Sequence, residues 1–389
     1  MSGPDLLDLD DPGALASGDP QGMLRVAATA GAQVRAAAAA TAEAGLAALR
    51  ADGRPRAVVT VGMGGSGIAG DVLAGVAGLA VPVPVVGHRA AGLPGWVGPV
   101  DLVAAVSCSG TTAETLSALE EAVRRGARVL AIGAADSPLA DLCERGRGVF
   151  VPVEQGRQPR AALWSLVLPL LLAGDALGLL ACGPEVVEAT AARLEQVAIA
   201  CRPDAESVTN AAKTLAADLM GTVPAVWGTS PLTGVAAYRT ACQLNENAKM
   251  PCSWGTLPEA AHNQVVALDG PHGARRRDGA ASRAGEGAGD DFFRDRVDDD
   301  AGLPLRLLLL RDAPGEEHAP VARTAAVVAG LARDRGVAVI ELRAEGSSPP
   351  ERLASLVGLV DFASVYSGLL HGIDPTPVDV ITELKARSA

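Results

Sequence analysis

Aromatic side chains are scarce in this chain of 389 residues: Phe, Trp and Tyr make up 3% of it, whereas hydrophobic residues make up 49%. The apolar side chains are therefore mainly those of Ala, Val and Leu, which suit helices packed on a parallel sheet. The chain is long enough for two domains, each with its own core. Composition alone thus favours a two-domain α/β protein.

Basic residues are outnumbered, with 33 Lys and Arg against 45 Asp and Glu, and the net charge is −12 at pH 7. A groove for nucleic acid needs clustered Lys and Arg to neutralise phosphates, so we expect no nucleic-acid partner. An anionic substrate must instead be held by local groups, such as hydroxyls and helix N-termini.

Signals for metal sites, secretion and membrane insertion are also lacking. The six cysteines form no CxxC pair, so we expect free thiols in a reducing compartment, with no metal and no cofactor. The acidic first residues do not have the pattern of a secretory signal. The most apolar segment, 161–173, contains Pro169 and is shorter than the ~20 residues of a spanning helix. We therefore expect a cytoplasmic protein and no membrane partner.

Short β-branched runs alternate with helical stretches in the first half of the chain, after an Ala-rich helical stretch at 22–51. Strands are expected at 56–61, 81–86, 102–106, 127–132 and 148–153, with a crossover helix at 113–125. This alternation predicts an N-terminal helical segment over 1–51 and a doubly wound α/β domain over 52–182.

A weaker set of signals indicates a second domain of the same class over 183–389. Its expected strands are 224–228, 265–268, 305–310 and 337–342, and its expected helices are 234–249, 320–334 and 350–370. Residues 269–302 are rich in Gly, Ala, Arg and Asp and poor in large apolar residues, so they are expected to form a flexible insertion. The predicted fold is two tandem doubly wound domains, each a parallel sheet flanked by helices.

The segment 58–71, VVTVGMGGSGIAGD, reads as a strand, a glycine-rich loop and a helix start. Gly64 and Gly65 would let the backbone approach an anion closely, beside Ser66 and the first helical N–H groups. The same pattern fits a dinucleotide-binding loop or a merely tight turn between strand and helix. All three interpretations stay open for this segment taken alone.

The segment 102–116, LVAAVSCSGTTAETL, reads as a second strand followed by a cluster of hydroxyls and a helix. Ser107, Ser109, Thr111 and Thr112 would gather at the carboxyl end of a strand, where open parallel sheets bind ligands. One hydroxyl is enough to cap a helix, so four within six residues favour a phosphate site.

The two loops together resemble the sugar isomerase (SIS) domain, and the chain is similar to the bifunctional phosphoglucose/phosphomannose isomerase family, which carries two such domains. The resemblance includes QLNENAKMP at 243–251, PEAAHNQV at 258–265 and DFASVYSGLLHGIDPTPVDVITELK at 361–385. It implies an aldose–ketose isomerase that interconverts glucose 6-phosphate, mannose 6-phosphate or both with fructose 6-phosphate through a cis-enediol, acting as a homodimer.

The resemblance also implies a role for each matching residue. Substrate and phosphate binding falls to Gly64, Gly65, Ser66, Ser107, Ser109 and Thr112. Arg160 would stabilise the intermediate, and Glu246 would move the proton between C1 and C2. His262, which in the family reaches in from the other subunit, and Lys385 would assist ring opening.

These assignments are chemically coherent. A carboxylate such as Glu246 can take a proton from one carbon and return it to the next, and a cation such as Arg160 can stabilise the enediolate oxygen. Ring opening requires a group that can exchange a proton near neutral pH, and a histidine side chain such as that of His262 suits this task. Two positions depart from the family pattern: Gln264 stands where Glu is common, and Cys108 where an aromatic is common.

Two other functions remain as alternatives at this point. A non-catalytic sugar-phosphate-binding regulator would keep the serine loops, but it would not need a base such as Glu246. A nicotinamide-dependent oxidoreductase would place an acid at the end of its second strand, where this chain has Gly87 and His88. The choice between the glucose and mannose epimers is left open by the sequence.

Overall fold

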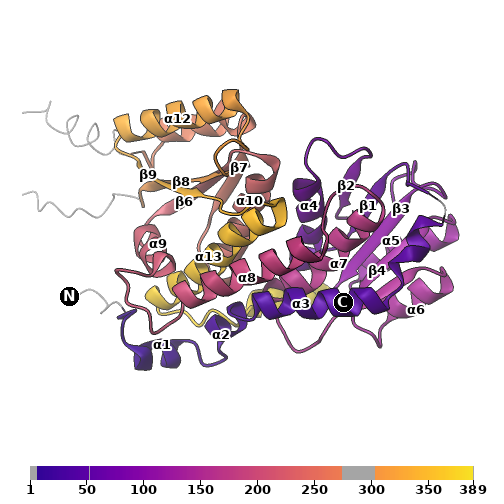
Figure 1. Cartoon of the computed structure of the whole chain (residues 1–389). Coiled ribbons are helices and arrows are strands. Elements are labelled where there is room, and N and C mark those ends of the chain that lie inside the picture. Colours follow the sequence, from indigo (N-terminus) through magenta and orange to yellow (C-terminus); the bar gives the residue numbers. More distant parts are fainter. Residues whose placement is uncertain (1–6, 52, 274–302, 389) are drawn as a thin grey trace, which may run out of the picture. The chain divides into compact units, whose positions relative to one another are not determined.

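The computed structural model describes residues 7–51, 53–273 and 303–388, so most of the predicted insertion lies outside the described residues. The chain forms two compact units, each built on one parallel sheet (Figure 1). The β1–β5 unit comprises Gly22–Arg202 and Glu345–Leu359, and the β6–β9 unit comprises Met1–Gln21, Pro203–Ala344 and Val360–Ala389. The predicted α/β class, with parallel sheets flanked by helices, is confirmed.

The first sheet has the order β2-β1-β3-β4-β5 and is parallel throughout. Its strands are β1 (Val58–Val61), β2 (Val85–His88), β3 (Leu102–Ser107), β4 (Arg128–Gly133) and β5 (Val149–Pro152). Every residue of β1 and β3 is buried, as expected for central strands covered on both faces. The order reverses between β1 and β3, which places the two predicted ligand loops side by side at one edge.

Helices cover both faces of this sheet. On one face, α5 (Ala113–Arg124) and α6 (Pro138–Arg145) pack on a core that includes Val59, Val103 and Ala105. The remaining helices of the unit are α2 (Met23–Ala27), α3 (Ala30–Glu43), η1 (Leu46–Arg50), α4 (Gly64–Ala77), η2 (Pro159–Ala161), α7 (Leu163–Ala176) and α8 (Pro184–Ala200). The predicted apolar core helix is α7; it is almost wholly buried and contains Pro169.

The second sheet has the order β7-β6-β8-β9 and is also parallel. Its strands are β6 (Val223–Gly228), β7 (Ser253–Thr256), β8 (Leu305–Arg311) and β9 (Ala338–Arg343). The helices of this unit are α1 (Pro12–Gly18), α9 (Ala211–Leu219), α10 (Pro231–Asn247), η3 (Glu259–His262), η4 (Gln264–Asp269), α12 (Ala319–Asp334), α14 (Asp379–Ser388) and part of α13 (Pro349–Leu370).

The prediction of a strand at 265–268 is wrong, because this apolar run forms the 3-10 helix η4. Leu268 is buried in the core, but Val266 is 68% exposed, so the run presents only part of its apolar surface inward. The strand that follows α10 in the chain is instead β7, which lies at the edge of the sheet. Its sequence, SWGT, has neither the length nor the β-branched composition of a buried strand.

Two further features bear on the predicted organisation. Helix α8 and Glu345–Leu359 belong to the β1–β5 unit, and the chain up to Gln21 belongs to the β6–β9 unit, so neither unit is one continuous stretch of the sequence. Helix α13 is long and apolar enough to span a membrane, but 78% of its most apolar window is buried inside the structure, as in a core helix.

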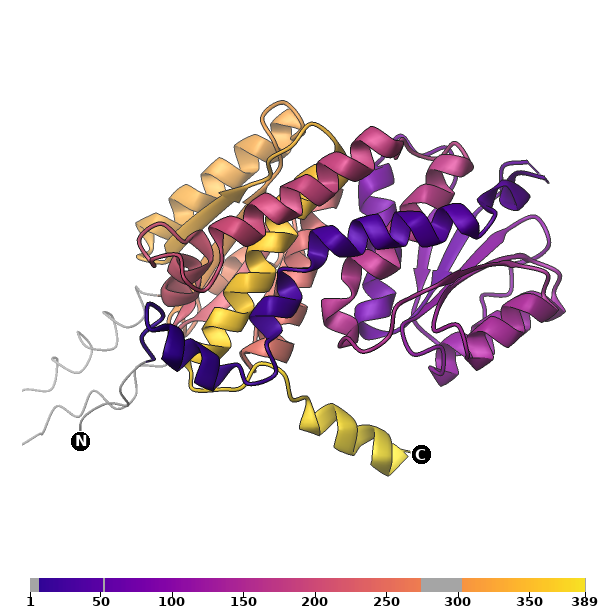
Figure 2. The ribbon, with the colours of Figure 1, turned by 60° about the horizontal axis from the view of Figure 1, so that its bottom comes forward.

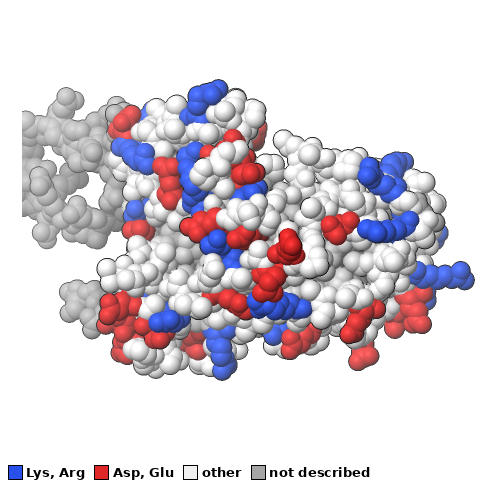
Figure 3. All heavy atoms as spheres, viewed as in Figure 1, with Lys and Arg blue, Asp and Glu red and all other residues white. Residues whose placement is uncertain are grey.

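On the face drawn in Figure 3, the acidic and basic side chains of the described residues are interspersed, and no continuous basic area covers it.

Candidate active site

The glycine loop between β1 and α4 is shaped by close backbone approaches. Gly64 has a φ of 52°, in the left-handed region that favours glycine. A Cβ on Gly65 would lie 3.1 Å from the Pro159 carbonyl and 3.2 Å from the Arg160 nitrogen. Gly65 therefore lets η2 pack directly on the start of α4, which brings Arg160 beside this loop.

The hydroxyl loop between β3 and α5 lies beside the glycine loop. The Cys108 N–H donates to the Ser66 hydroxyl at 3.2 Å, which joins the two loops. The Ser107 hydroxyl accepts from the Gly110 N–H at 3.1 Å and lies 3.0 Å from the Thr112 hydroxyl. Ser66 and Ser107 are buried and organise the loops, whereas Ser109 is exposed and Thr112 is half-buried.

Among the described residues, no side chain caps the N-terminus of α4 or of α5. Both helices start at the carboxyl ends of neighbouring strands, where their first N–H groups and dipoles favour an anion. The Ser109 and Thr111 hydroxyls lie 2.9 Å apart at this edge, within reach of the same ligand. The arrangement suits a phosphate group bound without a lysine.

Two arginines supply positive charge near these loops. Arg160 is 2% exposed. Arg89 follows β2, donates to the Gly67 carbonyl at 3.3 Å and pairs with Asp71. Burial raises the pKa of Asp71, although Arg89 acts to lower it. Gly67 makes room for Arg89, since a Cβ there would lie 3.1 Å from its Nε. Arg89 lies outside the two loop motifs of the sequence. The signal that could have indicated it as a site residue is its position directly after strand β2.

The proposed base, Glu246, lies in the last turn of α10, and an internal polar cluster anchors this helix. Arg239 donates through Nε and Nη2 to both carboxylate oxygens of Asp361, at 3.0 and 2.9 Å, and Gln243 donates to Asp361 at 2.9 Å. Asn247 donates to the Ser364 hydroxyl at 2.9 Å. These bonds hold the buried side of α10 against α13, and Glu246 itself is half-buried.

Lys249 ties the C-terminal segment of the chain to the end of α10. Its Nζ donates to the Glu246 carbonyl at 2.6 Å and to the Pro377 carbonyl at 2.9 Å. Its φ of 56° is unusual for a residue other than glycine. Pro377 lies just before α14, the helix at the C-terminus in Figure 2, which carries Lys385 on an exposed surface. The segment at Pro377, which leads into α14 and so to Lys385, therefore lies at the same end of α10 as Glu246.

His262 and Glu246 are not brought together within one β6–β9 unit. Helix α10 starts after the carboxyl end of β6 and runs back along the sheet for 17 residues, or about 25 Å, so Glu246 lies toward the opposite edge. Strand β7 then runs parallel to β6, and η3, which ends in His262, follows the carboxyl end of β7. His262 is exposed at that edge.

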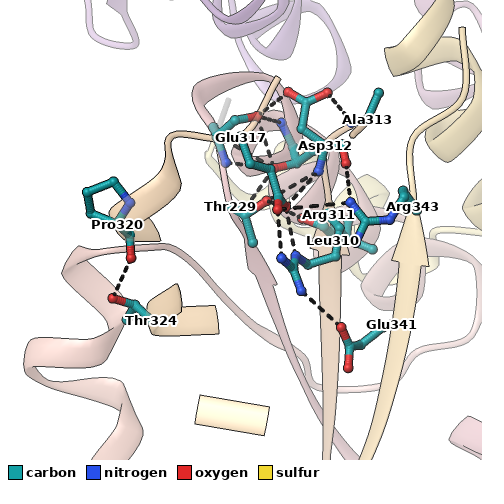
Figure 4. Close-up of polar contacts among 12 residues, drawn as sticks. Thr229, Leu310, Arg311, Asp312, Ala313, Glu317, Pro320, Thr324, Glu341 and Arg343 are labelled. Atoms are coloured by element: carbon teal, nitrogen blue, oxygen red, sulfur yellow. Dashed lines mark hydrogen bonds and ion pairs between the residues drawn. The ribbon is translucent and has the colours of Figure 1, made fainter. Parts of the chain in front are cut away.

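The carboxyl edge of the second sheet carries a closed network of charges and hydroxyls (Figure 4). Arg311 donates to both oxygens of Glu317, at 2.7 and 2.6 Å, and the Thr229 hydroxyl also donates to Glu317. The Ser230 hydroxyl donates to Asp312 at 2.7 Å. Burial acts to raise the pKa of Glu317, but the bonds from Arg311 and Thr229 outweigh it and hold that pKa below its usual value.

The fold and the two loops define a class: an α/β chain with two SIS domains. The SIS domain family matches residues 54–180, and the family described as the bacterial phospho-glucose isomerase C-terminal SIS domain matches residues 208–387. The chain is 30% identical to the bifunctional phosphoglucose/phosphomannose isomerase of Caldicellulosiruptor bescii over 85% of this chain and 89% of that protein. It is 29% identical to the Aquifex aeolicus protein of the same name over the same shares. The chain belongs to the bifunctional phosphoglucose/phosphomannose isomerase family.

Solved structures show the same fold at lower identity. A glucose-6-phosphate isomerase like protein from Thermus thermophilus has a TM-score of 0.57 at 18% identity, covering 97% of this chain and 99% of that one. The C-terminal domain of glucosamine-fructose-6-phosphate aminotransferase from Francisella tularensis has a TM-score of 0.62 at 13% identity, covering 91% and 97%. These likenesses support the α/β fold of the described residues.

Proposed function

We propose that this protein is an isomerase that interconverts glucose 6-phosphate and mannose 6-phosphate with fructose 6-phosphate through a cis-enediol. The observation that carries the proposal is the edge of the first sheet, where two uncapped helix N-termini and the hydroxyls of Ser109 and Thr112 are arranged for a phosphate. Membership of an isomerase family supports the reaction, and none of the relatives described above favours a non-catalytic regulator.

In this proposal each polar group has one task. Ser109 and Thr112 bind the phosphate, with Ser66 and Ser107 holding their loops in place. Glu246 carries the proton between C1 and C2. Arg160 stabilises the enediolate oxygen; its burial fits this task, because a cation acts more strongly where water is excluded. His262 and Lys385 assist opening of the sugar ring.

The base assignment is tested by Glu246→Gln, which keeps the shape of the side chain and removes its basicity. We expect kcat with fructose 6-phosphate to fall by roughly 10² or more while KM changes little. The matched control is Glu120→Gln, on the exposed surface of α5, which should keep full activity. Near-normal turnover by Glu246→Gln would exclude this residue as the base.

We also propose that the protein acts as a cytoplasmic homodimer in which His262 completes the site of the partner subunit. The separation of Glu246 and His262 along α10 and β7 supports this, since the two residues belong to opposite edges of one sheet. Two variants of low activity, Glu246→Gln and His262→Ala, are mixed under conditions that exchange subunits. A mixed dimer has both defects in one site, so about a quarter of wild-type activity should return at equal mixing. No recovery despite demonstrated exchange would contradict a shared site.

A further inference from the structure

The side-chain amide of Gln264 bridges two neighbouring strands of the second sheet, β6 and β7. Its Oε1 accepts a hydrogen bond from the Trp227 indole Nε1 at 2.8 Å, on β6. Its Nε2 donates to the Trp254 carbonyl at 3.1 Å, on β7. The opposite orientation of the amide would set an NH₂ group against the indole N–H, so the two partners determine how the amide lies.

Only a side chain that accepts and donates at once satisfies both partners. Trp227 is 2% exposed, so its indole N–H requires an acceptor inside the protein. A carboxylate could accept from Trp227, but it would place a second negative oxygen against the Trp254 carbonyl. A glutamine at this position therefore matches the surroundings that the strands provide.

The space for the amide is provided by Gly255. A Cβ on Gly255 would lie 2.8 Å from Nε2 and 3.0 Å from Oε1 of Gln264, and 3.1 Å from the Cβ of Ala260 in η3. The same glycine thus adjoins both the amide and the short helix that ends in His262. The backbone between them is also held, because the Asn263 side chain donates to Glu259 at 2.8 Å and accepts from the Gln264 N–H at 2.6 Å.

We propose that Gln264 is a positioning residue that fixes the backbone of His262 for ring opening. It lies two positions after the histidine, and its bonds to β6 and β7 fasten the turn between η3 and η4 to the sheet. The inference rests on the proposed function, since it requires that His262 acts in the isomerase reaction.

The test combines kinetics with unfolding. Gln264→Leu removes both bonds, and Gln264→Glu keeps only the acceptor when the introduced carboxyl group is ionised. Gly255→Ala displaces the amide while leaving Gln264 in the chain. Val266→Ala, at a residue of η4 that is 68% exposed, is the matched control and should leave activity and melting temperature unchanged. Isomerisation of glucose 6-phosphate and thermal unfolding are measured for each variant, alone and combined with His262→Ala.

We expect Gln264→Leu and Gly255→Ala each to lower kcat about tenfold with little change in KM, as displacement of a catalytic group does. In the His262→Ala background the same changes should lower the residual turnover by less than about twofold, because the group that they misplace is already gone. Equal losses in both backgrounds would mean that Gln264 has only a structural role, and would overturn the proposal. A Gln264→Leu protein that is folded and fully active would overturn it as well.

Gln264→Glu adds a readout that does not depend on catalysis. A neutral carboxyl group can accept from Trp227 and donate to the Trp254 carbonyl, whereas a carboxylate cannot donate. The folded variant should therefore prefer the protonated form of the introduced carboxyl group, and its melting-temperature deficit against wild type should shrink as the pH is lowered. A deficit that is independent of pH would show that the Trp254 bond does not form, which would contradict the proposal. Failure of the proposed function is recognised separately, as a wild-type protein without isomerase activity.

Discussion

At the point where strand order reverses, the two parallel sheets present different chemistry. Beyond β1 and β3 lie Ser109, Thr112 and the uncapped N-termini of α4 and α5. Beyond β6 and β8 lie the carboxylates of Asp312 and Glu317, already bonded to hydroxyls and to Arg311. The N-terminus of α10 is closed as well, by a capping box of Ser230 and Thr233.

The difference shows how little the fold alone decides about ligand binding. Both edges occupy the position at which doubly wound sheets bind ligands. The first offers hydrogen-bond donors, which suit a phosphate dianion. The second turns its hydroxyls and N–H groups toward the internal carboxylates of Asp312 and Glu317, so these donors already have partners within the unit. We therefore expect a sugar phosphate to bind at the first edge and not at the second.

The largest effect should follow from giving the first edge the chemistry of the second. Ser109→Asp places a negative charge beside the expected phosphate, where two unit charges ~4 Å apart repel by about 4 kcal/mol at an effective dielectric of 20. KM for fructose 6-phosphate should therefore rise at least about 100-fold. Ser109→Asn, of similar shape and neutral, should raise KM far less. Equal KM values for the two variants would show that the phosphate lies elsewhere.

Breaking the closed network at the second edge should affect stability instead. Glu317→Ala leaves Arg311 without its bidentate partner at a site where both side chains are at most 10% exposed. Loss of one member of a buried pair costs about 3 kcal/mol, measurable by urea unfolding. Thr324→Ala, at the exposed hydroxyl bonded to the Pro320 carbonyl in Figure 4, is the control and should cost under about 0.5 kcal/mol. If the two variants unfold alike, the network does not stabilise the unit.

The two edges should also respond to pH with opposite signs. The pKa of Glu317 is lowered in the folded protein, so its contribution is present above the unfolded pKa of about 4.5 and is lost as the pH falls through the folded value. The destabilisation by Glu317→Gln should therefore shrink in acid. Burial raises the pKa of Asp71, so its carboxylate costs stability at neutral pH and that cost disappears in acid. The stability of Asp71→Asn relative to wild type should decline as the pH falls, and the same sign for both variants would contradict this assignment.

The smallest effect concerns the two helix starts. Ser230→Ala removes a side chain that accepts from the Thr233 N–H and donates to Asp312, and loss of both the cap and this bond should cost about 2 kcal/mol. Thr112 stands at the N-cap of α5 without a capping bond, but its hydroxyl lies 3.0 Å from that of Ser107, so Thr112→Ala should cost about 1 kcal/mol of unfolding free energy while raising KM. Urea unfolding and steady-state kinetics on both variants would separate a structural start from a ligand-binding one.

The sequence by itself determined the elements whose signals are local. Every described strand except β7 overlaps an apolar run that predicts a strand, because such runs are bounded by nearby polar residues and turns. The two ligand loops were recognisable because glycine and hydroxyl residues cluster directly after a strand. The family motifs placed the candidate residues, whose roles stay predictions.

Tertiary structure decided what depends on residues far apart in the chain. Strand β7 forms because it pairs with β6 at the edge of the sheet, although SWGT has weak strand character. Residues 265–268 form a 3-10 helix because only part of their apolar surface packs in the core. The Glu317–Thr229 bond spans 88 residues and the Gln264–Trp227 bond 37. Such bonds leave no periodic pattern in the sequence, because each depends on where the backbone carries two unrelated segments.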